Sequence, residues 1–508
     1  MGKLLPVCFF GAIFAVYVAG VTPDMTWFSL GGDQFDYVVA AENFQAARPT
    51  SYPLLVCLGW VFELLPGNPF WNLALLSAVS TMVACVFIFL LVRHLVRNRS
   101  GLGARLAPYV GAAAYASSFP VWTQSVIPEV YTLAAMLMVV GVYLVVTRHF
   151  YWAAAVFGLS LGSHHLIAFA IFPCLVYVWY LKRKGEVSPK FRYMSLLVAL
   201  GLILYLQPLL FVGDPQETSN GLGVAVSQSG GTLPMIGQLP MTYVASRSFE
   251  FLVLLLPGVG AGLLLLGFLP RTRETWLLLV MALGPLIYYY VSIPPQWATF
   301  VVPGVAFLAV LIGVGAAYFP VTKAVAIVLA VMLVGVGMNL HHYDIGRSVD
   351  PAPTTARQMY EELDRVPDGA YIYTHTWGHG WMLIYYYCVE HDWRFTMVNQ
   401  GGILYQQPWY LDEMDKRGVA LPDYEYMDGI PGGFLWSTPE TAKFDMYEFL
   451  SLIVQENPGK DFWVCYLEDE EDPIKFNVAP VVLNDDGTCE IQKSAVPIMI
   501  SERDEEKR

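Results

Sequence analysis

Charged residues are scarce in this chain. Lys, Arg, Asp and Glu make up only 14% of its 508 residues, whereas 56% are hydrophobic. In a soluble globular protein about a quarter of the residues are charged. The composition therefore excludes an ordinary soluble protein and predicts a membrane protein.

Several sequence features that mark other protein classes are missing. The seven cysteines stand singly, with no CxxC pair, which argues against a disulfide framework and a cysteine-based zinc site. There is no GxGxxG motif, no phosphate loop and no internal repeat. His375 and His379 stand four residues apart, but the glycines beside them favour a loop over a helical zinc site.

The few charges divide unevenly along the chain. From His341 onward there are 31 acidic and 13 basic residues, a net charge of −18, and the preceding part has 11 acidic and 16 basic residues, a net of +5. The acidic part predicts a separate soluble domain at 342–501 and a charged flexible tail at 502–508. Nucleic acid is not an expected partner, because phosphate recognition needs a basic surface.

Long apolar runs fill residues 1–341. The first, 4–21, is interpreted as a retained helix rather than a secretory signal, since the loop after it needs both ends anchored. Ten further runs of about membrane-spanning length lie at 70–92, 106–126, 130–147, 150–163, 166–181, 193–211, 250–269, 275–292, 298–318 and 323–340. The sequence thus predicts a polytopic α-helical membrane protein with about eleven transmembrane helices.

The basic residues indicate how these helices are oriented, because cytoplasmic loops are enriched in lysine and arginine. With the first loop outside and the sides alternating, every basic residue before the acidic part falls inside except Arg48 and Arg247. Most acidic residues, and the pair His164-His165, fall outside. An odd number of spans also puts the acidic domain outside, as an extracytoplasmic domain.

The first outer loop carries two carboxylates, Asp33 and Asp36, near the point where the chain re-enters the membrane. Carboxylates are costly near hydrocarbon, so those that stay there usually have a function or a partner. The alternative is an interfacial loop with ordinary solvated aspartates. At a later outer edge, Glu129 follows Pro128 in the first turn of a predicted helix, where the helix dipole is a sufficient structural account of it. The functional alternative is that Glu129 orients a neighbouring residue of a site.

Five motifs in order resemble one group of GT-C superfamily integral-membrane glycosyltransferases. This group includes a eukaryotic protein O-mannosyltransferase and many bacterial and archaeal members. The resemblance covers 1–215 and continues weakly at 368–370 and 408–410. The motifs are GGDxxD at Asp33 and Asp36, Arg48-Pro49 with Tyr52-Pro53-Leu54, Pro128-Glu129-Val130-Tyr131 with Leu133, Gly162-Ser163-His164-His165, and Tyr205-Leu206-Gln207-Pro208-Leu209 with Gly213-Asp214-Pro215.

The chain departs from the usual pattern of this group at four places. The group usually has Glu at Asp36, His at Arg48, Pro-Gly at Thr50-Ser51 and Trp at Val212. These changes concern the sugar and the acceptor more than the class of reaction.

The resemblance implies inverting transfer of a sugar, mannose being one candidate, from a polyprenyl-phosphate-linked donor to an acceptor on the outer or lumenal face. By resemblance Asp33 is the general base for the acceptor, and Asp36 orients the acceptor or Asp33. Charge grows on the leaving lipid phosphate, so Arg48 is favoured as its cationic partner, with Arg247 as the other outer cation. His164, His165, Glu129 and Asp214 complete the predicted donor site, although Asp214 also suits a turn.

No cofactor is expected, although some relatives in the superfamily use a divalent ion, for which Asp33, Asp36 and His164 are the candidate ligands. The acceptor stays open among protein, lipid and glycan.

Two rival functions are a transporter, which needs polar groups at mid-membrane, and a non-catalytic scaffold or receptor in which Asp33 is replaceable. The lone sequon, Asn98-Arg99-Ser100, falls on the inner side. This favours the plasma membrane of a prokaryote over an endoplasmic reticulum.

The acidic domain reads as alternating helices and strands. Such alternation predicts a layered α/β domain with a partly parallel sheet. We expect strands at 370–373, 394–398 and 462–466, a turn at 367–369, and helices at 354–363, 381–389, 409–416 and 444–455.

Overall fold

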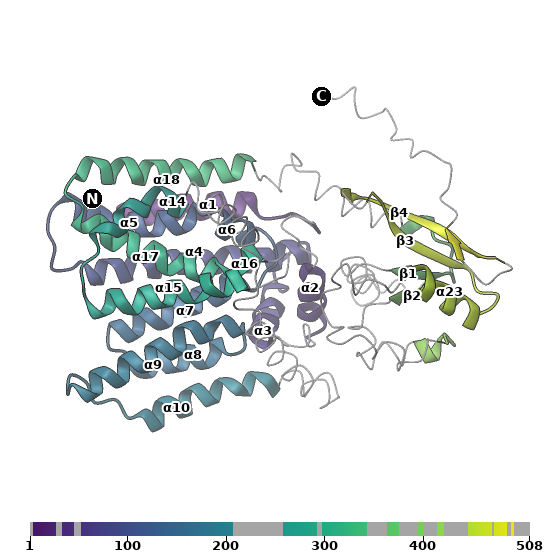
Figure 1. The fold of residues 1–508 in the computed structure, drawn as a ribbon, viewed down its shortest axis with the longest axis horizontal. Coiled ribbons are helices and arrows are strands. Elements are labelled where there is room, and N and C mark those ends of the chain that lie inside the picture. The colour runs from purple at the N-terminus through teal and green to yellow at the C-terminus, as the bar shows by residue number, and fades with distance from the viewer. Residues whose placement is uncertain are drawn as a thin grey trace. The chain divides into compact units, whose positions relative to one another are not determined.

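The computed structural model describes residues 4–26, 33–44, 52–206, 258–291, 297–342, 363–374, 395–399, 414–420, 446–469, 472–484 and 489–491. The chain divides into two compact units, Met1–Thr354 and Thr355–Arg508, whose elements are labelled in Figure 1. The domain limits drawn from the sequence, at 341 and 501, stay predictions.

The first unit is a bundle of helices, and a helix overlaps each apolar run predicted from the sequence. These helices are α1 (Leu4–Gly20), α4 (Pro69–Leu95), α5 (Leu102–Ala116), α7 (Tyr131–Val146), α8 (Phe150–Ser160), α9 (Ala168–Arg183), α10 (Phe191–Leu200) with η3 (Gly201–Tyr205), α14 (Gly258–Gly262) with η5 (Leu263–Phe268), α15 (Arg273–Val291), α17 (Val302–Tyr318) and α18 (Thr322–His342).

The core of the bundle forms around α17. This helix packs against α4, α5, α7 and α15, and every residue from 302 to 316 is buried. A helix that is apolar all round must be covered on every side. The sequence of α17, which has no charged residue, is compatible with this central position.

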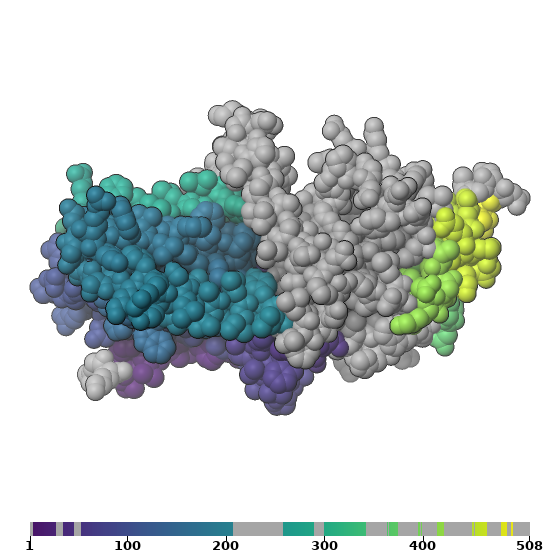
Figure 2. All heavy atoms as spheres, turned by 90° about the horizontal axis from the view of Figure 1, so that it is seen from below, coloured from purple at the N-terminus to yellow at the C-terminus, as the bar shows by residue number. Residues whose placement is uncertain are grey.

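The described part of the chain contains three helices that are both long and apolar enough to cross a membrane: Pro69–Leu95, His165–Arg183 and Thr322–His341. Most of the other apolar helices are shorter, with 10–17 residues, so the number of eleven spans stays a prediction. Large apolar side chains are exposed on α9 and α10, among them Phe172, Trp179 and Leu196. Part of this surface, in blue and teal, faces the viewer in Figure 2. Such a surface suits contact with lipid, and the first unit is integral to a membrane.

Two features of the bundle differ from the expectation. The first loop contains two helices that the sequence reading missed, α2 (Asp33–Asn43) and α3 (Pro53–Phe62). The run at 106–126, expected as one helix, is broken: α5 ends at Ala116 and α6 begins at Phe119 (Phe119–Ser125). The Ser117 and Ser118 hydroxyls donate back to the Ala113 and Ala114 carbonyls (both 2.7 Å). Pro120 then stands in the first turn of α6, where proline is favoured.

The second unit contains a mixed β-sheet. The described strands are β1 (Tyr371–Thr374), β2 (Thr396–Asn399), β3 (Phe462–Asp469), β4 (Asp472–Leu483) and β5 (Cys489–Ile491), in the order β2-β1-β3-β4-β5. β1 is parallel to β2 and to β3, whereas β3 with β4 and β4 with β5 are antiparallel.

The strands expected at 370–373, 394–398 and 462–466 are present as β1, β2 and β3, and the helix expected at 444–455 is α23 (Met446–Glu456). Gly369 has φ +82°, which fits the turn expected before β1. β4 and β5 were not expected. The helices expected at 354–363 and 381–389 lie almost entirely outside the described residues, and only the end of the one at 409–416 lies within them.

Candidate active site

Three of the predicted motifs meet at one end of the helical unit. Asp36 lies on α2, Glu129 lies just before α7, and His164 lies just before η2 (His165–Ile167). Their side chains are nearly inaccessible, with exposed fractions of 3%, 4% and 3%. Burying ionisable groups is costly unless they have polar partners. The structure thus places one candidate residue from each of three distant segments in the same interior region.

Tyr37 connects these segments. Burial raises the pKa of its hydroxyl, and the nearby Glu129 carboxyl raises this pKa further, followed by Tyr52, Tyr131 and Asp36. Three segments therefore lie close together around the Tyr37 hydroxyl: α2 with its GGDxxD motif, the start of α3 and the start of α7.

Aromatic contacts extend this arrangement to His164. The rings of Tyr37 and Tyr52 have centroids 5.9 Å apart. Tyr52 stacks on His164 with centroids 5.8 Å apart and an interplanar angle of 8°, and Tyr131 lies 5.0 Å from His164. Six residues make up what we call the motif cluster: Asp36, Tyr37, Tyr52, Glu129, Tyr131 and His164.

The sequence reading did not assign a role to the tyrosines of the motif cluster. Tyr37 stands beside Asp36, Tyr52 stands four residues after Arg48, and Tyr131 stands two residues after Glu129. The signal that could have found them is one tyrosine within or beside each of three motifs.

Glu129 is fixed through its backbone by Ser77 of α4. The Ser77 hydroxyl donates to the Glu129 carbonyl (3.1 Å) and lies 3.0 Å from the Glu129 N–H, which donates to it. The Val130 N–H donates to Glu129 Oε2 (3.2 Å) at the start of α7. The carboxylate therefore meets the helix N-terminus, as the structural account of Glu129 predicts. A role in orienting a reacting group stays a prediction.

The two histidines face different neighbours. His164 begins the turn η2, where its Nδ1 accepts from the Leu166 N–H (3.2 Å), and its ring faces the tyrosines of the motif cluster. The ring of His165 lies 4.1 Å from that of His164 and 5.8 Å from Tyr288 of α15. His165 Nε2 is buried and makes no hydrogen bond with any described residue.

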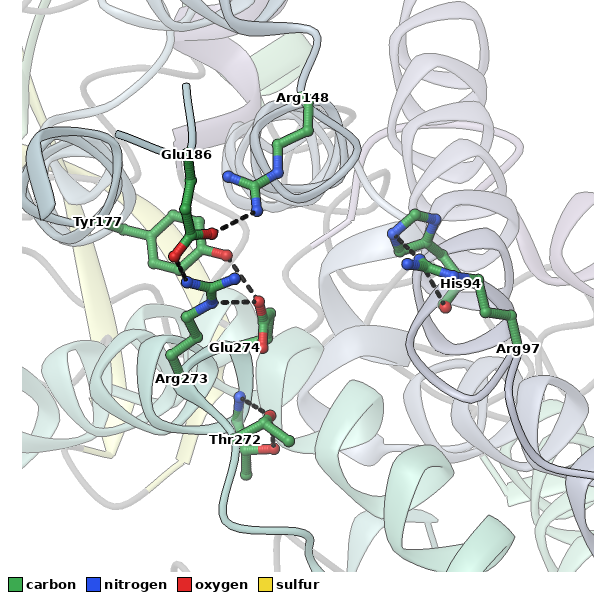
Figure 3. A network of polar contacts seen from close by, with 9 residues as sticks. His94, Arg97, Arg148, Tyr177, Glu186, Thr272, Arg273 and Glu274 are labelled. Carbon is green, nitrogen blue, oxygen red and sulfur yellow. Dashed lines mark hydrogen bonds and ion pairs between the residues drawn. The ribbon is translucent and has the colours of Figure 1, made fainter. Parts of the chain in front are cut away.

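A separate polar network lies beyond the C-terminal ends of α7 and α9 and at the start of α15. Figure 3 shows Arg273 bonded to Glu186 (2.6 Å) and to Glu274 (3.1 Å), and Arg148 close to Glu186 (3.6 Å). Tyr177 donates to Glu274 (2.8 Å). These groups come from loops that the charge pattern assigned to the inner side.

The motif cluster and this network lie at opposite ends of the helices that they share. Tyr131 begins α7 and Arg148 follows its end; His164 precedes η2 and α9, and Glu186 follows their end. The 16 residues of α7 correspond to about 24 Å of helix. The motif cluster and the network of Arg148, Glu186 and Arg273 therefore lie at different ends of these helices.

Other predicted site residues are described only partly or not at all. Asp33 is the first residue of α2, and its backbone alone is described. Arg48, Asp214, Arg247, His375 and His379 lie outside the described residues. Within the described part of the chain, no three His, Cys, Asp or Glu side chains are placed to share a metal ion. The expectation of a metal-free site stays a prediction.

Residues 33–188 match the family described as "Protein O-mannosyl-transferase TMEM260 N-terminal domain". This range contains the whole motif cluster. A curated relative, "Protein O-mannosyl-transferase tmem260" of Dictyostelium discoideum, is 27% identical over 210 residues, which cover 36% of this chain and 24% of the relative. The matched stretch thus spans about a quarter of the length of that relative.

Solved structures show a likeness in fold over nearly the whole chain. ArnT from Cupriavidus metallidurans in the apo state has a TM-score of 0.56 and 13% identity, with 94% of this chain and 98% of that chain covered. The same protein bound to undecaprenyl phosphate has a TM-score of 0.50 and 13% identity, with 98% and 100% covered. At this identity the likeness concerns the fold alone. The resemblance to integral-membrane glycosyltransferases that the motifs predict is therefore confirmed: residues 33–188 are similar to protein O-mannosyl-transferase TMEM260 N-terminal domains, and the chain shares the fold of ArnT.

Proposed function

We propose that this protein is a membrane glycosyltransferase that moves a sugar from a polyprenyl-phosphate-linked donor to an acceptor on the outer face of the membrane. The family match, which names O-mannosyl-transferases, supports the reaction class and makes mannose the first sugar to test. The complex of ArnT with undecaprenyl phosphate supports a polyprenyl-phosphate donor.

The observation that carries this proposal is the convergence of the motif cluster. Asp36, Glu129 and His164 come from three distant segments, and all three are buried around Tyr37 and Tyr52. A scaffold needs no such convergence of ionisable groups inside the protein. A transporter needs its polar groups near mid-membrane, whereas these lie at the starts of helices.

In the proposed mechanism Asp33 is the general base. It stands one helical turn before Asp36 at the start of α2, and residues three apart in a helix share a face. A carboxylate within hydrogen-bond reach of the acceptor removes its proton as the acceptor attacks the sugar carbon. The bond from that carbon to the phosphate oxygen breaks with inversion, and the electron pair leaves with the lipid phosphate. Asp36 orients Asp33 or the acceptor.

Cationic and N–H groups stabilise the charge that grows on the leaving phosphate. Arg48 is the first candidate, and Arg247 and Asp214 belong to the same predicted donor site. His165 adds a buried ring nitrogen that has no hydrogen-bond partner among the described residues. In the tautomer that carries its proton on Nε2, this ring donates to a phosphate oxygen. Donors already aimed at the developing charge lower the barrier to transfer.

We place the motif cluster and the C-terminal domain on the outer side of a prokaryotic plasma membrane. Support comes from the basic residues at the opposite end of α7 and α9, because basic loops favour the cytoplasm. The acceptor, whether protein, lipid or glycan, is a question for the experiment.

The test is transfer of radiolabelled sugar from polyprenyl-phosphate donors in membranes that contain wild type, Asp33→Asn or Arg48→Ala at equal expression. Glu42→Gln is a control on the same helix, and a parallel tube contains a chelator. We expect Asp33→Asn to lose a factor of about 10² to 10⁴, Glu42→Gln to stay close to wild type, and the labelled product to name the acceptor. Full transfer by Asp33→Asn contradicts the base assignment. If wild type transfers sugar from none of the donors, the scaffold becomes the better hypothesis.

A further inference from the structure

The turn between α9 and α10 is unusually basic. Within residues 182–192 it carries five cationic side chains and a single acid, Glu186. We call these five residues the basic turn: Lys182, Arg183, Lys184, Lys190 and Arg192.

Glu186 is bound by arginines from other loops. Arg273, which begins α15, holds it at 2.6 Å, and Arg148, after α7, lies 3.6 Å away, as Figure 3 shows. The carboxylate that could have neutralised the turn is thus shared with two cations from elsewhere. Among the described residues, no acid lies within ion-pair distance of the five cations of the basic turn, although Lys184, after Arg273 and Arg148, also contributes to lowering the pKa of the Glu186 carboxyl.

Aromatic rings lie next to each of these cations. The Lys182 ammonium lies 4.6 Å from the centroid of Phe191, and the Arg192 guanidinium lies 4.9 Å from that of Tyr193. Three longer contacts, of 5.5 to 5.9 Å, join Arg183 to Trp179, Lys184 to Tyr180 and Lys190 to Tyr193. Such contacts hold cations over aromatic faces without neutralising them.

The rings of this turn are themselves exposed. Trp179 is 51% exposed and Tyr193 is 44% exposed. Exposed apolar residues continue along the helices behind them, among them Phe172 on α9 and Leu196 on α10. Tyrosine and tryptophan prefer the headgroup level of a bilayer, and apolar residues prefer its interior. The surface therefore changes from cationic at the turn, through aromatic, to apolar farther along α9 and α10.

We propose that the basic turn binds the anionic headgroups of phospholipids in the inner leaflet. Five cations without a described ion partner complement the phosphates, and the exposed apolar residues of α9 and α10 accept the acyl chains. The exposed aromatic rim favours a lipid over a soluble phosphate compound. This inference depends on the orientation given under Proposed function but is independent of the transfer reaction.

The other inner loops lack this combination. Arg148 and Arg273 are engaged by Glu186 and Glu274. The turn between α4 and α5 also carries four cations and no acid within 93–105, but among these four a described cation–π contact is made by Arg99, 4.0 Å from the centroid of the Tyr318 ring. Arg271 and Lys323 stand in two further inner segments. The proposal is therefore specific to the α9–α10 turn and goes beyond a general excess of positive charge inside.

The test uses full-length protein in nanodiscs of phosphatidylcholine with and without phosphatidylglycerol. Phosphatidylglycerol that stays bound after extraction is counted by native mass spectrometry. One variant has all five residues of the basic turn replaced by Gln. A matched control replaces five other inner cations by Gln: Arg93, Arg97 and Arg105 around the α4–α5 turn, together with Arg271 and Lys323. A third variant exchanges Lys for Arg and Arg for Lys throughout the basic turn, which keeps its charge.

Each Lys or Arg close to an anionic surface contributes a factor of about five in binding. We therefore expect the Gln variant of the basic turn to retain at least about tenfold less phosphatidylglycerol than wild type. The control set and the charge-keeping variant should retain it. Equal retention by the Gln variant, or an equal loss in the control set, overturns the proposal. Because lipid retention is measured without any sugar donor, the result does not depend on whether the transferase proposal is right.

Discussion

The rings of Tyr52 and His164 lie nearly parallel, 8° apart in orientation and 5.8 Å apart at their centroids. Tyr52 stands directly before α3 and His164 directly before η2. The same two segments are joined by the Leu54 N–H, which donates to the Gly162 carbonyl (2.9 Å). The first loop is thus attached to the loop after α8 by one ring stack and one backbone hydrogen bond.

Replacing Tyr52 by Leu should loosen this attachment, whereas Tyr52→Phe should not. Ring pairs of this kind contribute about 0.5–1.5 kcal/mol beyond the area that they bury. Tyr52 has φ 34°, a strained value that Leu and Phe share equally, so the two variants differ in the ring alone. We expect Tyr52→Leu to lower both the melting temperature in detergent and sugar transfer by more than Tyr52→Phe does. Equal behaviour of the two variants would show that the stack is unimportant.

Ser77 and Ser80 on α4 offer a matched pair. Both are buried, but Ser77 bonds the N–H and the carbonyl of Glu129, whereas Ser80 Oγ makes no hydrogen bond with any described residue. Ser77→Ala leaves two buried backbone groups without this partner, which costs about 1–3 kcal/mol. Ser80→Ala should be neutral or slightly stabilising. The measurement is the thermal midpoint of each variant, and a midpoint for Ser77→Ala as high as that for Ser80→Ala would contradict the prediction.

The helices of the bundle were predictable because their sequences leave little choice. A run such as 302–318 contains no charged residue and no alternation of apolar and polar residues that would favour a strand. Such a run is stable only as a helix in the protein interior or in a membrane. α3 was missed because its ten apolar residues are too few to span a membrane, and α2 was missed for the opposite reason. α2 is short and has the polar sequence DQFDYVVAAEN, so its helical state comes from packing against α3 and α4 rather than from its composition.

The strands β4 and β5 and the ring contacts could not be predicted from the sequence, for different reasons. β4 contains Pro473 and Pro480, and proline within an apolar run argues against a strand. The stack of Tyr52 on His164 joins residues more than a hundred positions apart, and no local pattern specifies such a contact. That the motifs lie at one end of the helices could still be predicted, because the charge of the loops indicates on which side of the membrane each motif lies.

The contact between α8 and η3 leaves no space for a side chain. A Cβ at Gly201 would lie 2.0 Å from the carbonyl of Gly158, well inside any van der Waals contact. Gly201→Ala must therefore push the two segments apart, and overpacking of this kind typically costs about 1–3 kcal/mol. Gly11→Ala on α1 is the control, since a Cβ there meets nothing within 4 Å. Melting in detergent should separate the two variants, and a Gly201→Ala protein as stable as Gly11→Ala would contradict the packing.

Glu63, at the end of α3, should make stability depend on pH. Asn72 Nδ2 donates to Glu63 Oε2 (3.1 Å). Burial raises the pKa of the Glu63 carboxyl to about 7; the hydrogen bond from Asn72 opposes this rise, and nearby Glu42 adds to it. Between about pH 4.5 and pH 7 the folded protein thus keeps a proton that the unfolded chain releases. This contribution to stability is complete below about pH 4.5 and is lost as the pH rises through 7.

The expected size is about 1–2 kcal/mol, because the partial exposure of Glu63 weakens the effect. Glu63→Gln keeps a carbonyl oxygen that can accept from Asn72 but cannot titrate. The melting temperature of wild type should therefore fall relative to that of Glu63→Gln as the buffer moves from about pH 5 to about pH 8. Other titrating groups affect both proteins alike, so the difference between their two curves isolates Glu63. Parallel curves over this range would mean that Glu63 is ionised in the folded protein throughout.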